Sequence, residues 1–426
     1  MLHTSRNITA AITALLVLTA CGDTTLIEEH VVVRSHDDLA KLHGITAIQG
    51  NLSVMVDGVE SLAPLSELIH VEGDLIISRT DSLIDLSGLE NLVSVSGRIT
   101  IGMNDSLKNL AGLDNLQEAG ELWINGNPEL ETIGGLSALK VILDDFVLWQ
   151  NPVLENLNGL SKLEYVGGDL KVCENQALAS LNELSSLNEI GEGLIVVNNS
   201  ALLDLGNLGQ VQHLSGELNI SVNPQLVNLD GLDGLVTVGG NAQVYGLALL
   251  TDTNGLSNLT RVEGNLIIWR NPEMTNIDGL AKLEYVGQKL EIAENGSLTD
   301  LAGLKNLGEV NSHIVIQKNE KLTHFDGLTK LHTIAGTFAV QLNASLTNID
   351  EISNVQNIGG EISIRYNDNL DSIDGLRGIT SVQGSLTVTD NRNLSDCSIE
   401  NLLKDISNDI GGPTTISNNN AELICE

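Results

Sequence analysis

Residues 279–298 read GLAKLEYVGQKLEIAENGSL, and this stretch decides the fold. It contains two apolar positions three apart, then two apolar residues separated by one, then an Asn with a Leu three residues later. The separated pair has the alternation of a β-strand that buries one side. The positions in question are Leu280, Leu283, Val286, Leu290, Ile292, Asn295 and Leu298.

The separated pair recurs along most of the 426-residue chain, every 23 or 24 residues up to Leu386 and after 28 residues at the last step. Such a fixed period indicates a repeat architecture, in which each unit buries its apolar side only against its neighbours. The sixteen first positions are Leu52, Leu75, Ile99, Leu122, Phe146, Leu170, Leu194, Leu218, Ala242, Leu266, Leu290, Ile314, Phe338, Ile362, Leu386 and Thr414.

Each unit carries three apolar clusters, which predict three inward faces and therefore a roughly triangular coil of stacked parallel strands. In the unit around Leu170 the clusters contain Leu160 and Leu163, then Val166 to Val172, then Leu178 and Leu181. Helices are not expected inside the repeat, because Gly and Asn interrupt every unit.

An Asn stands three residues after the second strand position in thirteen of the sixteen units, from Asn104 to Asn419. Asp57, Thr80 and Leu247 take its place in the other three. A column of side-chain amides can donate and accept along the stack and so satisfy backbone groups at a buried corner. The same Asn tolerates the left-handed backbone conformation that a sharp corner needs.

In these repeated residues the chain resembles the receptor L domain, the leucine-rich-like β-helix of insulin and growth-factor receptors. The match runs from about residue 42 to residue 425, and its Asn-to-Leu gap of three, as from Asn127 to Leu130, departs from the gap of two in ordinary leucine-rich repeats. The resemblance implies an all-β, right-handed parallel β-helix, a solenoid of about 16 rungs with 24-residue repeats. It implies little about function, because that family is defined by a scaffold.

The ends of the coil need caps, since an open solenoid exposes strand edges and core. Apolar residues at Ile399, Leu402, Leu403 and Ile406 have helical spacing, which predicts a short C-terminal capping helix. Residues 396–426 would then form the cap and last rung, after a solenoid over 42–395. We expect a disulfide between the two cysteines of the cap and a single, solvent-side thiol in the coil. These residues are Cys397, Cys425 and Cys173.

Residues 1–20 read as a signal peptide, with Arg6 before the apolar stretch 8–18. The following Leu18-Thr19-Ala20-Cys21 resembles the lipobox of bacterial lipoproteins, which implies cleavage before Cys21 and acylation of that residue. An ordinary signal peptide with a Cys after its cleavage site is the alternative. The lipoprotein reading predicts a spacer over 21–41, a lipid as the only membrane tether, and a place in the bacterial cell envelope, at the outer membrane.

The composition excludes a general nucleic-acid role, because 56 Asp and Glu against 21 Lys and Arg give a formal charge of −35. A chain with 42% apolar residues is also too hydrophobic for acidic disorder. No nucleotide-binding, zinc-protease or nucleophile motif is present, and no cofactor or metal is predicted. His30, His36 and His43 are spaced as solvated or capping residues, and Asp-Gly pairs such as Asp278-Gly279 read as turns.

Aromatic residues on the outward side of the strands are the strongest functional signal. Trp149, Tyr245 and Trp269 share one outward column, and Trp123 lies in the adjacent one. They form two pairs about five rungs apart, a separation that suits an extended contact better than a small-molecule pocket. Outward aromatic and β-branched residues also stack on a parallel ladder for structural reasons alone.

These observations predict a non-catalytic recognition or adhesion module for a protein or glycan partner. A passive envelope spacer is the first alternative. A polysaccharide-active β-helix enzyme is the second, and the steady period without long inserted loops argues against it.

Overall fold

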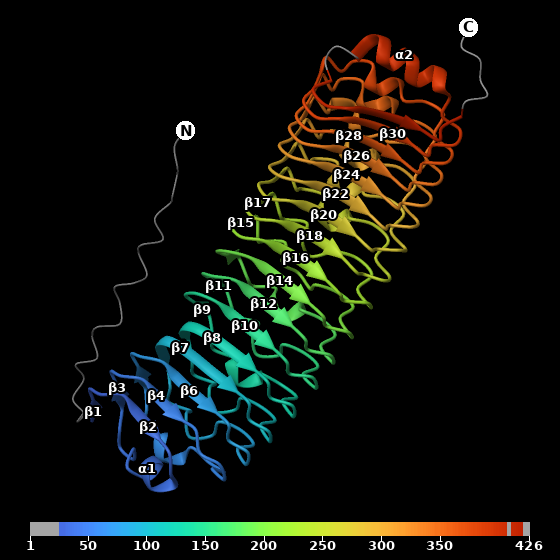
Figure 1. Ribbon diagram of the computed structural model, residues 1–426. Coiled ribbons are helices and arrows are strands. Elements are labelled where there is room, and N and C mark those ends of the chain that lie inside the picture. Colours follow the sequence, from blue (N-terminus) through green and yellow to red (C-terminus); the bar gives the residue numbers. More distant parts are fainter. Residues whose placement is uncertain (1–24, 407–409, 421–426) are drawn as a thin grey trace.

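The computed structural model describes residues 25–406 and 410–420, and these form one long coil of stacked turns (Figure 1). Each turn has a long strand, a corner with a tight turn, and a short strand. The long strands are β2 (Val31–Val33), β4 (Leu52–Val54), β6 (Leu75–Ser78), β7 (Ser94–Gly102), β8 (Glu118–Asn125), β10 (Phe146–Trp149), β12 (Leu170–Cys173), β14 (Leu194–Val197), β16 (Leu218–Ser221), β18 (Ala242–Tyr245), β20 (Leu266–Trp269), β22 (Leu290–Ala293), β24 (Ile314–Gln317), β26 (Phe338–Gln341), β28 (Ile362–Arg365), β30 (Leu386–Thr389) and β31 (Thr414–Ser417).

The short strands occupy a second side of the coil. They are β1 (Leu26–Ile27), β3 (Ala47–Ile48), β5 (His70–Val71), β9 (Val141–Ile142), β11 (Tyr165–Val166), β13 (Glu189–Ile190), β15 (His213–Leu214), β17 (Thr237–Val238), β19 (Arg261–Val262), β21 (Tyr285–Val286), β23 (Glu309–Val310), β25 (Thr333–Ile334), β27 (Asn357–Ile358) and β29 (Ser381–Val382). β7 and β8 are long enough to run through both sides, so they join the two rows of strands into one sheet in this part of the coil.

All strand pairs are parallel and join equivalent positions of successive turns, as when Leu266 pairs with Leu290. This register confirms the sixteen predicted rungs from Leu52 to Thr414. The apolar clusters of every turn point inward, and in the unit around Leu170 the predicted residues are all fully buried. The structure is therefore an all-β parallel solenoid with a continuous apolar core.

The third side of the coil contains single turns of 3-10 helix rather than extended chain. These are η1 (Ala63–Leu65), η2 (Gly134–Leu136), η3 (Asn182–Leu184), η4 (Asn254–Leu256), η5 (Asp278–Leu280), η6 (Ala302–Leu304), η7 (Leu328–Lys330), η8 (Asp350–Ile352) and η9 (Asp374–Leu376). The expectation of no helix inside the repeat thus holds for α-helices from Leu52 to Leu386 but misses these 3-10 turns. The Asp-Gly glycines are needed here for close packing, since a Cβ on Gly279 would lie 1.8 Å from the carbonyl oxygen of Thr253.

The Asn column forms a buried hydrogen-bonded ladder, as predicted. The Asn319 backbone N–H and its side-chain amide both donate to Oδ1 of Asn343, at 3.1 and 3.3 Å, and the same amide donates to the Ile292 carbonyl at 2.9 Å. The expectation that these Asn residues adopt the left-handed conformation is wrong. The residue before each takes it, including Lys318 with φ 54° and Leu342 with φ 58°, because the Asn side chain itself must turn inward.

The N-terminal end differs from the predicted spacer. Among the described residues of 21–41, β2 pairs with β4 and adds one more rung, and α1 (His36–Ala40) follows with Ser35 as its N-cap. The solenoid therefore begins before residue 42. The spacer prediction failed because this first turn lacks the Asn and the Leu spacing of the others.

The C-terminal end carries the predicted capping helix, α2 (Asp396–Ile406), which buries Ile399, Leu402 and Ile406. Figure 1 shows α2 across the end of the stack. Cys397 in its first turn is disulfide-bonded. Its predicted partner Cys425 lies outside the described residues, as do residues 1–20 and Cys21. The disulfide partner, the signal peptide and the acylation of Cys21 therefore stay predictions. None of the described helices combines the length and the apolar character that a bilayer crossing requires.

Candidate functional site

The outward side of the long strands, here called the long-strand face, presents two columns of side chains per strand. In β20, Leu266 and Ile268 are fully buried while Ile267 and Trp269 are half-buried and point outward. This alternation follows from the pleat of a strand, whose successive side chains point to opposite sides. It places the four aromatic residues singled out from the sequence on this face.

Tyr245 and Trp269 come together. They are directly paired in the register of β18 and β20, with ring centroids 5.8 Å apart and planes inclined at 35°. The guanidinium carbon of Arg270 lies 4.7 Å from the Trp269 ring centroid, so a cation covers part of the indole.

Trp123 and Trp149 do not pack on one another in the same way. Register places Trp123 beside Val147, and Trp149 beside Asn125. The Trp123 indole N–H donates to Glu121 at 2.5 Å, and Arg98 lies 4.5 Å from its ring centroid. Trp149 is 39% exposed. Of the two predicted aromatic pairs, only Tyr245 with Trp269 forms a ring contact.

A larger feature extends over β14 to β18, includes Tyr245, and was missed from the sequence. On β14, β16 and β18 and the corners that follow, residues 193–203, 218–229 and 239–251 contain no Asp, Glu, Lys, Arg or His. We call this surface the charge-free strip. Its most exposed apolar side chains are Leu203 at 50%, Val227 at 43%, and Val222 and Leu249 at 41% each.

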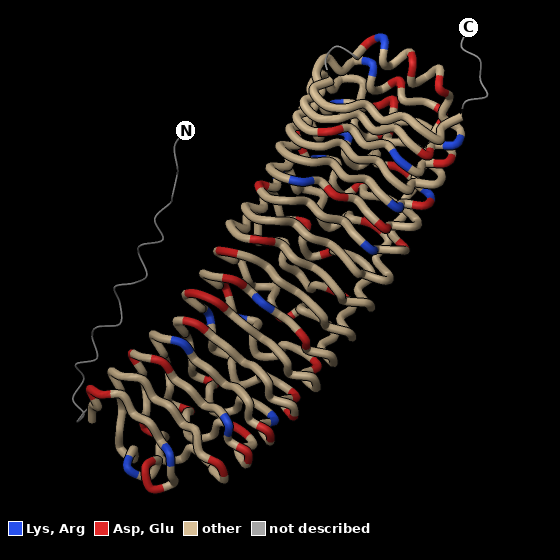
Figure 2. Tube along the Cα trace, in the orientation of Figure 1, with Lys and Arg blue, Asp and Glu red and all other residues tan. Residues whose placement is uncertain are grey.

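The strip is distinctive because the rest of the coil is densely charged. The preceding turn carries Lys171 and Glu174, and the following turn carries Arg270 and Glu273. In Figure 2 the corner in the middle of the coil is correspondingly free of both charge colours. The sequence carries this signal as three consecutive units without charge after the strand, in corner residues that lie outside the strand columns.

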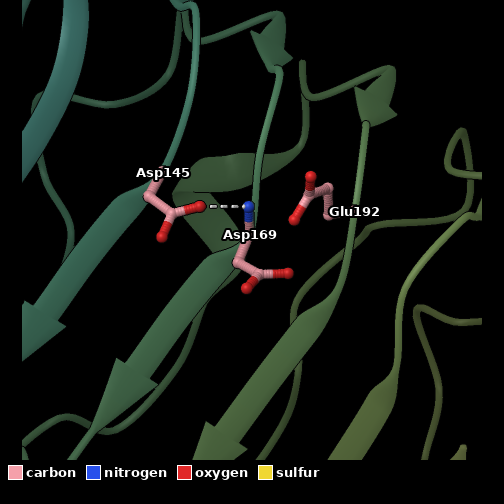
Figure 3. Close-up of side chains that lie close together, drawn as sticks. All are labelled: Asp145, Asp169 and Glu192. Atoms are coloured by element: carbon pink, nitrogen blue, oxygen red, sulfur yellow. Dashed lines mark hydrogen bonds between the residues drawn. The ribbon is translucent and has the colours of Figure 1, made fainter. Parts of the chain in front are cut away.

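Carboxylates border the start of the strands next to the strip. Asp145, Asp169 and Glu192 come from three successive turns, and their oxygens lie within 4.8 Å of one another (Figure 3). The Asp145 carboxylate accepts from the Asp169 backbone N–H at 2.8 Å, and that of Asp169 accepts from Gly193 at 2.6 Å. Glu217 continues the row one turn later.

Lys171 supplies the counter-charge for this row. Its ammonium lies 3.0 Å from Asp145 and 2.8 Å from Asp169. Burial lowers the pKa of Lys171, but its hydrogen bonds to Asp169 and Asp145 outweigh that effect and raise the pKa above the ordinary value. A divalent cation wants several free oxygens around one point, and here an amine already occupies two of the carboxylates. We therefore treat the row as an acidic border of the face.

Cys173 is a free thiol in the outward column, half-buried as its neighbours are. Burial raises its pKa, which keeps it protonated and unreactive at neutral pH. His30, His36 and His43 do not converge: His30 accepts from the Asn51 backbone N–H, whereas His36 bonds the Gly58 carbonyl. These contacts agree with the non-functional roles expected for Cys173 and the three histidines.

Comparison with known proteins does not assign the chain to a family. No family model matches the chain, and no curated protein sequence matches it. Among solved structures, the chain is similar to an internalin from Listeria monocytogenes, with 14% sequence identity and a TM-score of 0.30. The alignment covers 90% of this chain and 85% of that one.

Proposed function

We propose that this chain is a non-catalytic recognition module that binds a protein partner on the charge-free strip. The observation that carries the proposal is the exposure of Leu203, Val222, Val227 and Leu249 on three consecutive turns in a chain of net charge −35. Exposed apolar residues without charge among them match the centre of protein interfaces, which are depleted of charged side chains.

The acidic border indicates what kind of protein surface would complement the strip. Asp145, Asp169, Glu192 and Glu217 carry four negative charges beside the strip, with Lys171 as the one cation among them. A protein surface with an apolar centre and basic residues along one margin complements this arrangement. Charge complementarity of that kind steers association and fixes the orientation of the complex.

The lipid tether belongs to the same proposal. Acylation of Cys21 would hold the coil at the bacterial cell envelope, where a partner meets the strip along its length. Metabolic labelling with a fatty-acid analogue tests this, since Cys21→Ala should abolish label incorporation and release the chain from membranes. Labelling that persists in Cys21→Ala would overturn the tether without touching the strip.

Site-specific photo-crosslinking tests the binding surface. A benzophenone amino acid is placed at Ile195 and, separately, at Leu249 in the strip, and at Val315 as a control. Val315 occupies the same outward column as Ile195 and is equally half-buried, but it lies beside Glu291. We expect one common adduct from the two strip positions and none from Val315.

A charged substitution in the strip tests whether the crosslinked adduct depends on that surface. Val197→Asp adds a charge to the strip at an outward, half-buried position, so the adduct at Leu249 should disappear. No adduct at either strip position would favour the passive spacer. An adduct at Val315 of equal strength would mean non-specific contact and would also contradict the proposal.

A further inference from the structure

A groove crosses the short-strand side of the coil, away from the charge-free strip. It spans β21, β23 and β25 as an open depression of about 600 Å³. Tyr285, Gly308 and His332 line it on three successive turns, with Glu284, Glu309 and Lys330 around them. Its volume lies in the range of small-ligand sites.

The groove exists because one side chain is missing. The residue just before each short strand is Glu284, Gly308, His332 and Gln356 on four successive turns. A Cβ on Gly308 would meet mainly the His332 imidazole, at 3.2 Å from Nε2, with backbone no closer than 3.8 Å. Packing of the coil therefore does not demand a glycine here, unlike at Gly279. The glycine leaves room on the outside.

One wall of the groove is a fixed aromatic ring. Arg261 on β19 covers the Tyr285 ring, with its guanidinium carbon 3.5 Å from the centroid, and is itself held by an ion pair with Glu263. The Tyr285 hydroxyl accepts from the Asn311 side chain at 2.8 Å. Tyr285 lines the groove beside Arg261, so part of its ring surface can be reached from the groove.

Polar groups of both kinds surround that ring. Among the described residues, neither Glu284 nor Glu309 has an ion-pair partner, so both carboxylates can accept hydrogen bonds. Lys330 donates to Asn306 at 2.6 Å and keeps two further N–H groups. His332 bonds Thr333 through Nδ1, which leaves Nε2 at the groove.

This combination selects the class of ligand. The carboxylates of Glu284 and Glu309 stand among the cationic groups of Arg261 and Lys330, so the lining favours neither an anion nor a cation by net charge. An apolar molecule would strip water from these charged groups without replacing its hydrogen bonds. A hydroxyl group both donates to a carboxylate and accepts from an ammonium. A ring with apolar C–H groups on one side can also lie against the open aromatic surface. We propose that this groove binds a neutral saccharide unit, independently of the protein partner on the strip.

Ligand-observed saturation-transfer NMR on the purified chain tests the proposal. The probes are maltose, cellobiose and N,N′-diacetylchitobiose at millimolar concentration. We expect saturation transfer to at least one of the three sugars. Absence of transfer to all three would overturn the proposal.

Two variants locate the site. Gly308→Gln should fill the groove and abolish transfer while folding normally, because Gln356 takes the same position two turns later. Thr380→Gln is the matched control: it adds the same side chain at the equivalent exposed position before β29, outside the groove, and should leave transfer unchanged.

Tyr285→Leu keeps an apolar residue on β21 but removes the ring, and should weaken binding by about tenfold or more. The Tyr285→Leu variant also tests the location of the site if Gly308→Gln fails to fold. Undiminished transfer in Tyr285→Leu, or transfer that survives in a folded Gly308→Gln, would show that the sugar binds elsewhere. Failure here leaves the strip untouched, since the crosslinking positions lie on another side of the coil.

Discussion

Asn319 and Asn343 are joined along the axis of the coil by two hydrogen bonds, from the backbone N–H and the side-chain amide of Asn319 to Oδ1 of Asn343. Both side chains are fully buried. The Oδ1 atom of Asn319 accepts in turn from the backbone of Asn295 at 3.1 Å. The Asn319 amide thus bonds polar groups of the preceding turn and the amide of the following turn.

Removing one amide should therefore destabilise the coil strongly. Asn319→Ala removes the Oδ1 atom that accepts from the Asn295 backbone N–H and side-chain amide, at a cost of about 2–5 kcal/mol in the free energy of unfolding. Asn393→Ala, at an exposed position, should change it by less than about 0.5 kcal/mol. Urea unfolding followed by circular dichroism measures both, and equal midpoints for the two variants would refute a structural role for the ladder.

Two glycines distinguish positions where close packing requires glycine from positions where glycine only adds conformational freedom. Gly279→Ala places a Cβ 1.8 Å from the Thr253 carbonyl oxygen, so adjacent turns must move apart at a cost of about 1–3 kcal/mol. A Cβ on Gly296 has no atom within 4 Å, and Gly296→Ala should stabilise by about 0.4–1 kcal/mol through the unfolded chain. Thermal melts of the pair should shift in opposite directions; shifts of the same sign would contradict the packing.

The residues with positive φ before each ladder position include one where a substitution to glycine should stabilise the coil. Val222 has φ 55°, a conformation that costs a β-branched residue about 1–2 kcal/mol, and glycines Gly126 and Gly246 fill the same column elsewhere. Val222→Gly should raise the free energy of unfolding by about 0.5–1 kcal/mol after the entropy of glycine is counted. Val227→Gly, exposed but without positive φ, should lower it. The expectation fails if chemical denaturation ranks the two variants the other way.

The N-terminal cap predicts an acid-sensitive contact. Hydrogen bonds from Lys41 and Ser35 lower the pKa of Asp38 from 3.8 to about 2. The stabilisation from this contact is therefore complete above pH 3.8 and is lost as the pH falls through about 2. The carboxyl carbon resonance of Asp38 should titrate with that midpoint, and Lys41→Met should move it upward. A midpoint unaffected by Lys41→Met would assign the shift to another cause.

The repeat, the register and the Asn ladder could be predicted because each depends on a residue type that recurs at a fixed spacing. The left-handed column could not, since residues as different as Arg79, Met103 and Val222 occupy it. What fixes it is the inward turn of the buried residue that follows, usually Asn but Thr80 after Arg79, which is a tertiary requirement. The first turn, around β2, was missed because the distance from Val31 to Leu52 is shorter than the repeat and its neighbours are acidic.

Only part of the candidate surface could be predicted from the sequence. Trp149 and Trp269 stood out by residue type, and alternation placed them outside the coil. The exposure of Leu203 and Leu249 did not stand out, because each immediately follows or precedes a buried Leu of the same type. Which of two adjacent leucines points outward is decided by the corner geometry, and only the structure supplies it.

The central claim is that the charge-free strip is a protein-binding surface. Its most direct test is calorimetric titration of the partner identified by crosslinking against the unmodified chain, Ile195→Asp and Val315→Asp. A buried unpaired carboxylate at Ile195 should weaken binding by about a hundredfold, whereas the same change at Val315 should alter it less than about twofold. Equal affinities for Ile195→Asp and the unmodified chain would contradict the claim.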